Sequence, residues 1–99
     1  MKLVTFVSDY KMNVDTLDRL KPEKLGIVLV ENGVYHATMK ENGNPSSILN
    51  HSADYYVLLN DLETRGLTAD DVIDSKVKVI GFGDIVDLMF NDYDKSAWL

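Results

Sequence analysis

Four apolar runs constrain the fold of this 99-residue chain more than any other feature of its sequence. They span residues 3–7, 27–30, 55–59 and 77–82, and their apolar side chains are continuous instead of alternating with polar ones. Such runs are typical of strands that are covered on both faces, as in parallel sheets. We therefore predict that they form central parallel strands.

Segments with helical spacing separate these runs. The predicted helices cover about residues 13–20, 33–40, 61–65 and 84–91, and the last has Ile85, Leu88 and Met89 toward the sheet. Alternation of strand and helix predicts an α/β fold: a small, open, doubly wound, mainly parallel sheet of four to five strands flanked by helices. The chain length fits one domain over residues 1–99.

Turn residues mark where these elements end. Gly66 is expected to take the left-handed conformation after the third helix, and Thr68 with Asp71 forms a potential capping box. Asparagines, Gly43 and Pro45 disfavour regular structure in the polar stretch 41–47.

Composition excludes several classes of protein. The chain has no cysteine, which excludes disulfides, thiolate metal sites and a covalent relay through its own thiol. A net charge of −6 would repel a phosphate backbone, so direct nucleic-acid binding is not expected. No stretch approaches the length of a membrane span or a signal peptide, which indicates a cytoplasmic protein.

Motifs of catalysis are weak or absent. Gly81, Phe82 and Gly83 follow a strand, but the third glycine of a nucleotide-binding turn is replaced by Val86. Ser8 has no nucleophile-elbow motif around it. We predict no catalytic residue and no cofactor.

Metal ligation is not indicated either. His36 and His51 lie outside any metal-ligand spacing, and solvated or capping roles are expected for both. The cluster of Asp70, Asp71 and Asp74 lacks the glycine and the distal glutamate of a calcium loop, and it is interpreted as a charged helix face.

Polar residues that directly follow the predicted strands are the candidate site. Open parallel sheets bind ligands at the carboxyl ends of their strands, although helix capping explains such residues equally well. Trp98 is an independent candidate, because so large an apolar side chain near the chain end must pack back onto the domain or dock on a partner. The candidate crevice or interface residues are Ser8, Asn32, Gly33, Asn60, Asp61, Asp84 and Trp98.

A series of residues in the carboxyl-terminal half resembles a known family. Asp61 and Leu62 precede Arg65, Gly66 and Leu67; an apolar strand, Asp84 and Leu88 follow; and the chain ends in Ala97, Trp98 and Leu99. This series resembles the TusB/DsrH family of sulfur-relay subunits. Upstream, Glu31, Asn32, Gly33 and Val34 after an apolar strand are similar to the family pattern.

The resemblance implies a DsrEFH-like α/β subunit that assembles with TusC/DsrF-like and TusD/DsrE-like partners. In such complexes persulfide sulfur passes between cysteines, toward 2-thiolation of the tRNA wobble uridine or in dissimilatory sulfur oxidation. The TusD/DsrE subunit carries the principal cysteine, and this chain has none, so we expect a non-catalytic scaffold role.

Two alternatives stay open at this point. The chain alone is expected to form a homo-oligomer in place of its missing partners. The sequence is also compatible with a small-molecule binder or enzyme, if the strand-end crevice is concave and lined with convergent polar groups, or with a regulator that has lost the relay role.

Overall fold

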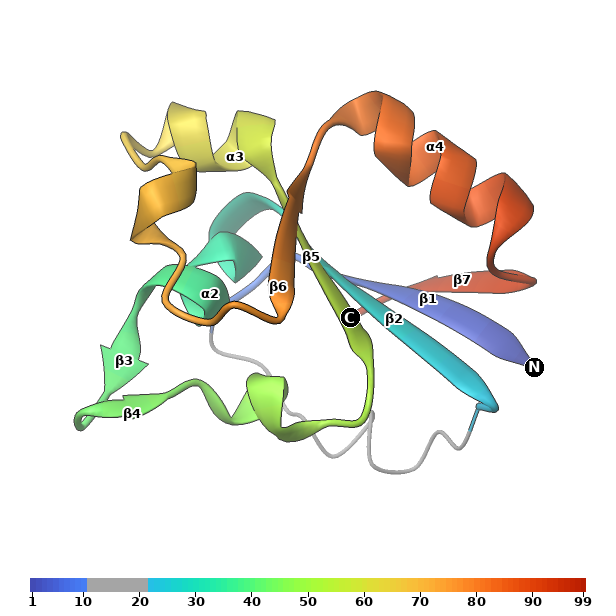
Figure 1. Cartoon of the computed structure of the whole chain (residues 1–99), viewed down its shortest axis with the longest axis horizontal. Helices are drawn as coiled ribbons and strands as arrows, with labels where there is room; N and C mark the ends of the chain where they lie inside the picture. Colours follow the sequence, from blue (N-terminus) through green and yellow to red (C-terminus); the bar gives the residue numbers. More distant parts are fainter. Residues whose placement is uncertain (11–21) are drawn as a thin grey trace.

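A sheet of five parallel strands forms the centre of the molecule (Figure 1). The computed structural model describes residues 1–10 and 22–99. The strand order is β6-β5-β2-β1-β7, and every neighbouring pair is parallel. The bounds are β1 (Lys2–Val7), β2 (Lys24–Leu29), β5 (Asp54–Leu58), β6 (Val77–Ile80) and β7 (Lys95–Trp98). The predicted α/β fold with an open parallel sheet is confirmed.

The fifth strand, β7, replaces the tail that was expected after the last helix. Its residues pair in register with β1, so that Leu3 lies opposite Lys95 and Phe6 opposite Trp98. Beyond the strand, the Leu99 N–H donates to the Phe6 carbonyl at 2.9 Å. The four residues of β7 show no strand pattern in the sequence, because two of them are polar and they do not alternate. They form a strand because the edge of β1 is free to pair with them.

The helices are α2 (Tyr35–Thr38), α3 (Leu59–Thr64) and α4 (Phe82–Asn91), with 3-10 turns η1 (Glu31–Val34), η2 (Ser47–Asn50) and η3 (Ala69–Asp71). Each α-helix falls within or overlaps a predicted helix, and α3 and α4 begin two residues earlier than expected. The helix expected at residues 13–20 lies outside the described residues. None of the described helices is both long and apolar enough to cross a membrane.

Both predicted turn signals are confirmed. Gly66 has a φ of 71°, the left-handed conformation that ends α3. The Thr68 N–H donates to the Asp71 carboxylate at 2.8 Å, which completes the capping box before η3.

The stretch that was expected to lack regular structure contains a short antiparallel hairpin, β3 (Lys40–Glu41) and β4 (Asn44–Pro45). Asn42 and Gly43 connect its strands with φ values of 51° and 81°. Positive φ at both central positions is what a tight hairpin turn needs, and Asn-Gly is the dipeptide that provides it at least cost. The expectation was wrong because Asn42 and Gly43 were interpreted as residues that interrupt regular structure, whereas together they form the turn of a hairpin.

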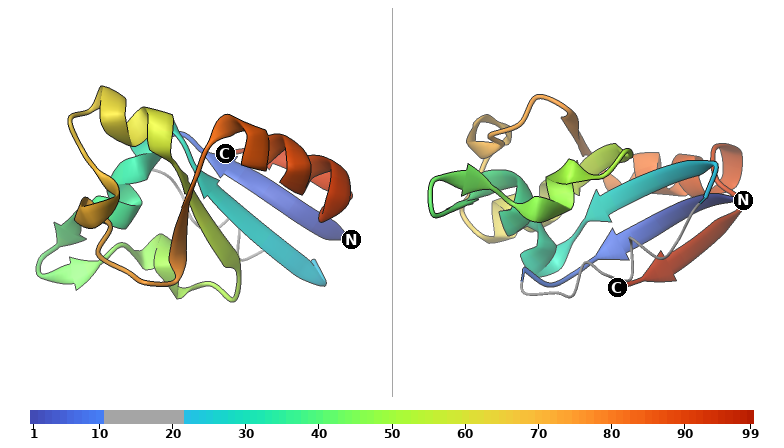
Figure 2. Two further views of the ribbon diagram at one scale, coloured as in Figure 1. Left: turned by 45° about the horizontal axis from the view of Figure 1, so that its top comes forward. Right: turned by 90° about the horizontal axis from the view of Figure 1, so that it is seen from below.

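Alternate residues of the strands point to opposite faces of the sheet, and both faces are covered (Figure 2). On one face, residues such as Leu3, Ile27 and Val57 pack with α2, α3 and η2. On the other, Val4, Val28 and Tyr56 pack under Ile85 and Leu88 of α4. Helices on both faces confirm a doubly wound sheet, and burial on both faces explains why the strands are continuously apolar.

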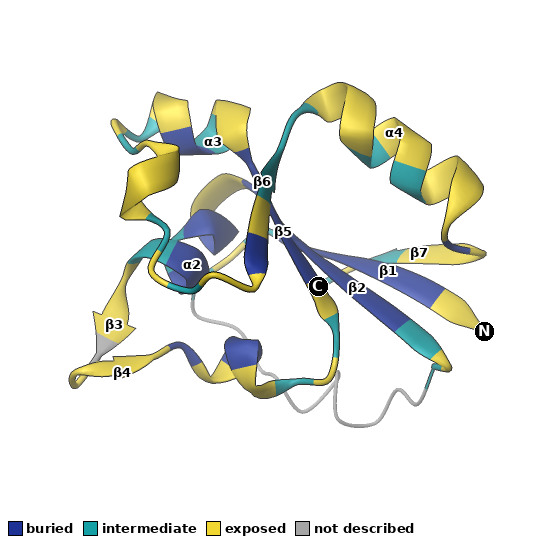
Figure 3. Cartoon of the chain, in the orientation of Figure 1, coloured by how far each residue is buried: buried dark blue, intermediate teal, exposed yellow. Residues whose placement is uncertain are grey.

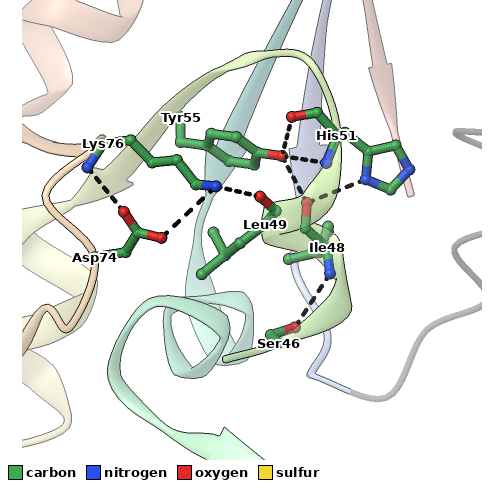
Figure 4. Close-up of polar contacts among 7 residues, drawn as sticks. All are labelled: Ser46, Ile48, Leu49, His51, Tyr55, Asp74 and Lys76. Atoms are coloured by element: carbon green, nitrogen blue, oxygen red, sulfur yellow. Dashed lines mark hydrogen bonds and ion pairs between the residues drawn. The ribbon is translucent and has the colours of Figure 1, made fainter. Parts of the chain in front are cut away.

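The segment η2 is held to the sheet by a polar cluster around Tyr55 (Figure 4). The buried Tyr55 hydroxyl lies 2.8 Å from the Ile48 carbonyl and accepts a hydrogen bond from the His51 N–H at 2.9 Å. Burial raises the pKa of this phenol to about 12. Lys76 Nζ donates to the Leu49 carbonyl and lies 3.7 Å from the Asp74 carboxylate. The cluster therefore has a structural role.

His36 is not solvated, contrary to expectation. The residue is 3% exposed, and its ring is hydrogen-bonded through Nδ1 to the Ser46 hydroxyl and through Nε2 to the Asp9 carbonyl at 3.0 Å. His51 makes a local contact to the end of η2, since its Nδ1 lies 3.1 Å from the Ile48 carbonyl. The position of His36 on the inner side of a short helix could not be distinguished from an outer one by spacing alone.

Candidate functional site

Two candidate residues, Asn32 and Asp61, belong to one polar cluster at the carboxyl ends of β2 and β5. Arg65, at the end of α3, joins them: its Nε and Nη2 donate to the Asn32 amide oxygen at 3.1 and 3.0 Å. Its Nη1 donates to the Asp61 carbonyl at 3.1 Å and lies 3.9 Å from the Asp61 carboxylate. The guanidinium therefore fastens the turn after β2 to the helix after β5.

The same cluster holds Glu31 in an unusual backbone conformation. Glu31 has a φ of 50°, which costs a residue with a Cβ about 1 kcal/mol. The Asp61 carboxylate accepts the Glu31 N–H at 2.7 Å and so stabilises this conformation. The Glu31 side chain makes no ion pair with the described residues and stands exposed at the strand ends.

Gly33 has a packing role. It is buried in η1, and a Cβ added to it would lie 1.9 Å from the carbonyl oxygen of Val7. The Gly33 N–H donates to the Val30 carbonyl at 2.8 Å, and the Val30 N–H donates to the Val7 carbonyl at 3.0 Å. Only glycine allows the turn after β2 to approach the end of β1 this closely.

Asp84, Asn60 and Ser8 lie outside this cluster. The Asp84 carboxylate accepts the Gly81 N–H at 3.0 Å, so it caps the start of α4. Asn60 is exposed on α3, where its carbonyl accepts from the Thr64 hydroxyl at 2.8 Å. Ser8 is half-buried just after β1 and is not among the residues that line the strand-end pocket.

A pocket of about 420 Å³ opens at the strand ends between α4 and β7. Its floor and walls are mostly apolar, and two carboxylate residues, Glu31 and Asp61, line one end. The lining residues are Phe6, Val30, Glu31, Leu58, Asp61, Phe82, Ile85, Met89, Ser96 and Trp98. The candidates Asp61 and Trp98 therefore share one concave surface.

Trp98 packs back onto the domain and also leaves surface that a partner could cover. Its ring stacks on Phe6, with the centroids 5.0 Å apart and the planes at 23°, yet 64% of the residue stays exposed. A residue that packs back but leaves most of its surface in water still has apolar area to offer.

Neither a metal-ligand cluster nor a thiol is found among the described residues. No group of three or more histidine, aspartate and glutamate side chains in this part of the chain is placed to hold a metal ion. Asp71 and Asp74 are used in a capping box and in an ion pair with Lys76. The chain has no thiol that could carry sulfur.

Sequence reasoning missed the aromatic and apolar lining of this pocket. Phe82 and Met89 are exposed although the sequence placed Met89 toward the sheet. A signal was present: in α4 apolar residues occupy more of the circumference than one sheet-facing stripe needs. The sequence identified Arg65 only as a member of the series that resembles the family, because its partner Asn32 lies far away in sequence.

A family profile and curated relatives place this chain in one family. The profile of the "DsrH like protein" family matches residues 7–95. "Protein TusB" of Photorhabdus laumondii and "Protein TusB" of Yersinia pestis are each 31% identical over 91 residues, covering 92% of this chain and 93% of theirs. The solution structure of protein Tm0979 from Thermotoga maritima superposes with a TM-score of 0.61 at 27% identity, covering 93% of this chain and 94% of that one. The chain belongs to the TusB/DsrH family.

Proposed function

We propose that this protein is a non-catalytic subunit of a sulfur-relay complex of the TusBCD/DsrEFH type. Its partners are TusC/DsrF-like and TusD/DsrE-like subunits, and the complex works in the cytoplasm. The observation that carries the proposal is a family match over nearly the whole chain in a sequence without cysteine.

The chemistry of sulfur relay determines which subunits must carry cysteine. A persulfide needs a cysteine sulfur as its carrier, and transfer needs a second thiolate as the acceptor. Because this chain supplies neither, the sulfur passes between cysteines of its partners. Its own contribution is to hold those partners in place, which the exposed apolar surface of α4 and Trp98 supports.

Co-purification tests the assembly. The tagged chain is expressed with the TusC- and TusD-like subunits of its own organism, and the purified material is analysed by mass spectrometry for subunits and for persulfide on their cysteines. Recovery of both subunits in fixed stoichiometry supports the proposal. A chain that purifies alone under these conditions contradicts it.

Two processes fit such a complex, thiolation of the tRNA wobble uridine and sulfur oxidation, and a gene deletion distinguishes them. Loss of 2-thiouridine from tRNA, restored by the wild-type gene, assigns the first. Normal 2-thiouridine together with impaired growth on reduced sulfur compounds assigns the second. If both phenotypes are normal, the relay function is wrong.

The strand-end pocket favours one alternative, a homo-oligomeric binding or regulatory protein. An apolar pocket of about 420 Å³ falls in the size range of small-molecule sites. Native mass spectrometry of the chain purified alone tests this alternative, which predicts an oligomer with a retained small molecule.

A further inference from the structure

A continuous apolar groove runs between α4 and the edge strand β7. At one end it is the strand-end pocket, with Phe6 as its floor. A second hollow of about 200 Å³ continues it, and Met89 and Ser96 line both. We call this the α4–β7 groove and define it by Phe6, Phe82, Met89, Phe90, Ser96 and Trp98.

The walls of the groove expose large apolar side chains. Phe82 is 61%, Phe90 83% and Trp98 64% exposed, and Val86 extends the same stripe of α4. The residues 82, 86, 89 and 90 lie on one side of a helix, next to but distinct from the side that packs on the sheet. Figure 3 shows the outer surface of α4 as exposed along its length. So much clustered apolar surface marks an interaction site.

The surroundings of the groove are acidic. Glu31 and Asp61 line its strand-end pocket, and Asp94 lines the opposite hollow. Asp87 is exposed on α4, and neither it nor the Glu31 carboxylate makes an ion pair with the described residues. Lys95 is the basic residue that lines the second hollow, but it stands on β7 at a position that alternates with the groove-facing Ser96 and Trp98.

We infer that the α4–β7 groove docks an apolar segment of one partner subunit, and that an Arg or Lys of that segment lies between Glu31 and the exposed aromatic rings of Phe82 and Trp98. The inference rests on the proposed function and names the surface that performs it. A cation beside a carboxylate and over aromatic faces is attracted by both, most strongly once the site is closed from water.

A second copy of this chain fits the groove poorly. The chain carries a net charge of −6, and a two-fold contact through α4 would place Asp87 and its neighbours close to their own equivalents. Like charges across an interface oppose association. A partner with a basic rim has the complementary charge.

The test uses the complex of this chain with its TusC- and TusD-like subunits. Phe90→Asp is compared with Met39→Asp, a matched control at an exposed apolar residue outside the groove. Glu31→Lys tests the charge, and exchanging the partner's facing basic residue for glutamate should restore binding. We expect Phe90→Asp and Glu31→Lys each to weaken assembly by about tenfold or more, while Met39→Asp leaves it unchanged.

Trp98 gives an independent signal because it is the single tryptophan of this chain. With tryptophan-free partner variants, acrylamide should quench its fluorescence strongly in the isolated chain and weakly in the complex. Thermal unfolding of each isolated variant shows whether the fold is intact, and a variant that fails to fold is replaced by Phe90→Ser.

Each outcome decides the inference. A complex that forms with wild-type affinity despite Phe90→Asp, with Trp98 still quenched, overturns the groove and leaves the proposed function standing. A complex that never forms contradicts both. A dimer of the isolated chain that Phe90→Asp dissociates assigns the groove to a second copy, and a small apolar molecule retained there assigns it to a ligand; either result overturns the inference.

Discussion

Arg65 donates two hydrogen bonds to the amide oxygen of Asn32, from Nε at 3.1 Å and from Nη2 at 3.0 Å. The two residues follow different strands, β2 and β5, which are neighbours in the sheet. The contact therefore fixes the relative positions of the two turns that form the carboxyl-end edge of the pocket. It also brings Asp61 to the backbone of Glu31.

Replacement of Arg65 by lysine should loosen this edge. A lysine ammonium is a point donor and cannot make the forked contact to Asn32 while also reaching the Asp61 carbonyl. We expect a loss of about 1 kcal/mol in the free energy of unfolding, measured by urea denaturation. Lys78→Arg, at an exposed position of β6, is the control and should have no effect. Equal stability of the Arg65→Lys variant and the wild type would contradict this role.

Gly33→Ala and Gly83→Ala should change stability in opposite directions. A Cβ at Gly33 would lie 1.9 Å from the Val7 carbonyl oxygen, and backbone atoms must move to admit it. We expect destabilisation of about 1–3 kcal/mol or more. Gly83 lies within α4, where an added Cβ meets nothing within 4 Å, so alanine should stabilise the helix by up to about 1 kcal/mol. Thermal unfolding of both variants measures the two signs, and a tolerated Gly33→Ala would show that the turn can shift.

Alkaline pH should destabilise the protein through Tyr55. The pKa of its phenol rises from 10.0 to about 12 because burial disfavours the phenolate. The folded state therefore holds this proton more tightly than the unfolded chain does. The resulting stabilisation is complete below about pH 10 and is lost as the pH rises through about 12.

Tyr55→Phe separates this effect from general alkaline denaturation. The variant should be about 1 kcal/mol less stable at neutral pH, because the hydrogen bond to the Ile48 carbonyl is lost. Its stability should also fall less steeply than that of the wild type between about pH 10 and pH 12. Urea denaturation at several pH values measures both slopes, and parallel slopes would disprove the assignment to Tyr55.

The sheet was predictable from sequence because burial on both faces leaves continuous apolar runs, and these identified β1, β2, β5 and β6. Strand β7 was not, since its four residues show no alternation of polar and apolar side chains and it is an edge strand that pairs only with β1. Of the site candidates, Asn32 and Asp61 lie in one polar cluster, where both contact Arg65. Their link through Arg65 depends on side-chain geometry across the sheet, which no local pattern encodes.

Substitution by serine on the two apolar sides of α4 should have very different effects on the stability of the isolated chain. Leu88 is partly buried and packs against the core beneath the helix, and Leu88→Ser should cost about 1–3 kcal/mol because it removes apolar packing there. Phe90 is 83% exposed, so Phe90→Ser should change the stability of the isolated chain by no more than about 0.5 kcal/mol. It should also raise solubility, because it removes apolar area from the groove wall. Urea denaturation and light scattering of the isolated variants measure both effects. A large loss of stability in Phe90→Ser would mean that this ring stabilises the isolated chain. Less of the apolar surface of α4 would then be available to a partner.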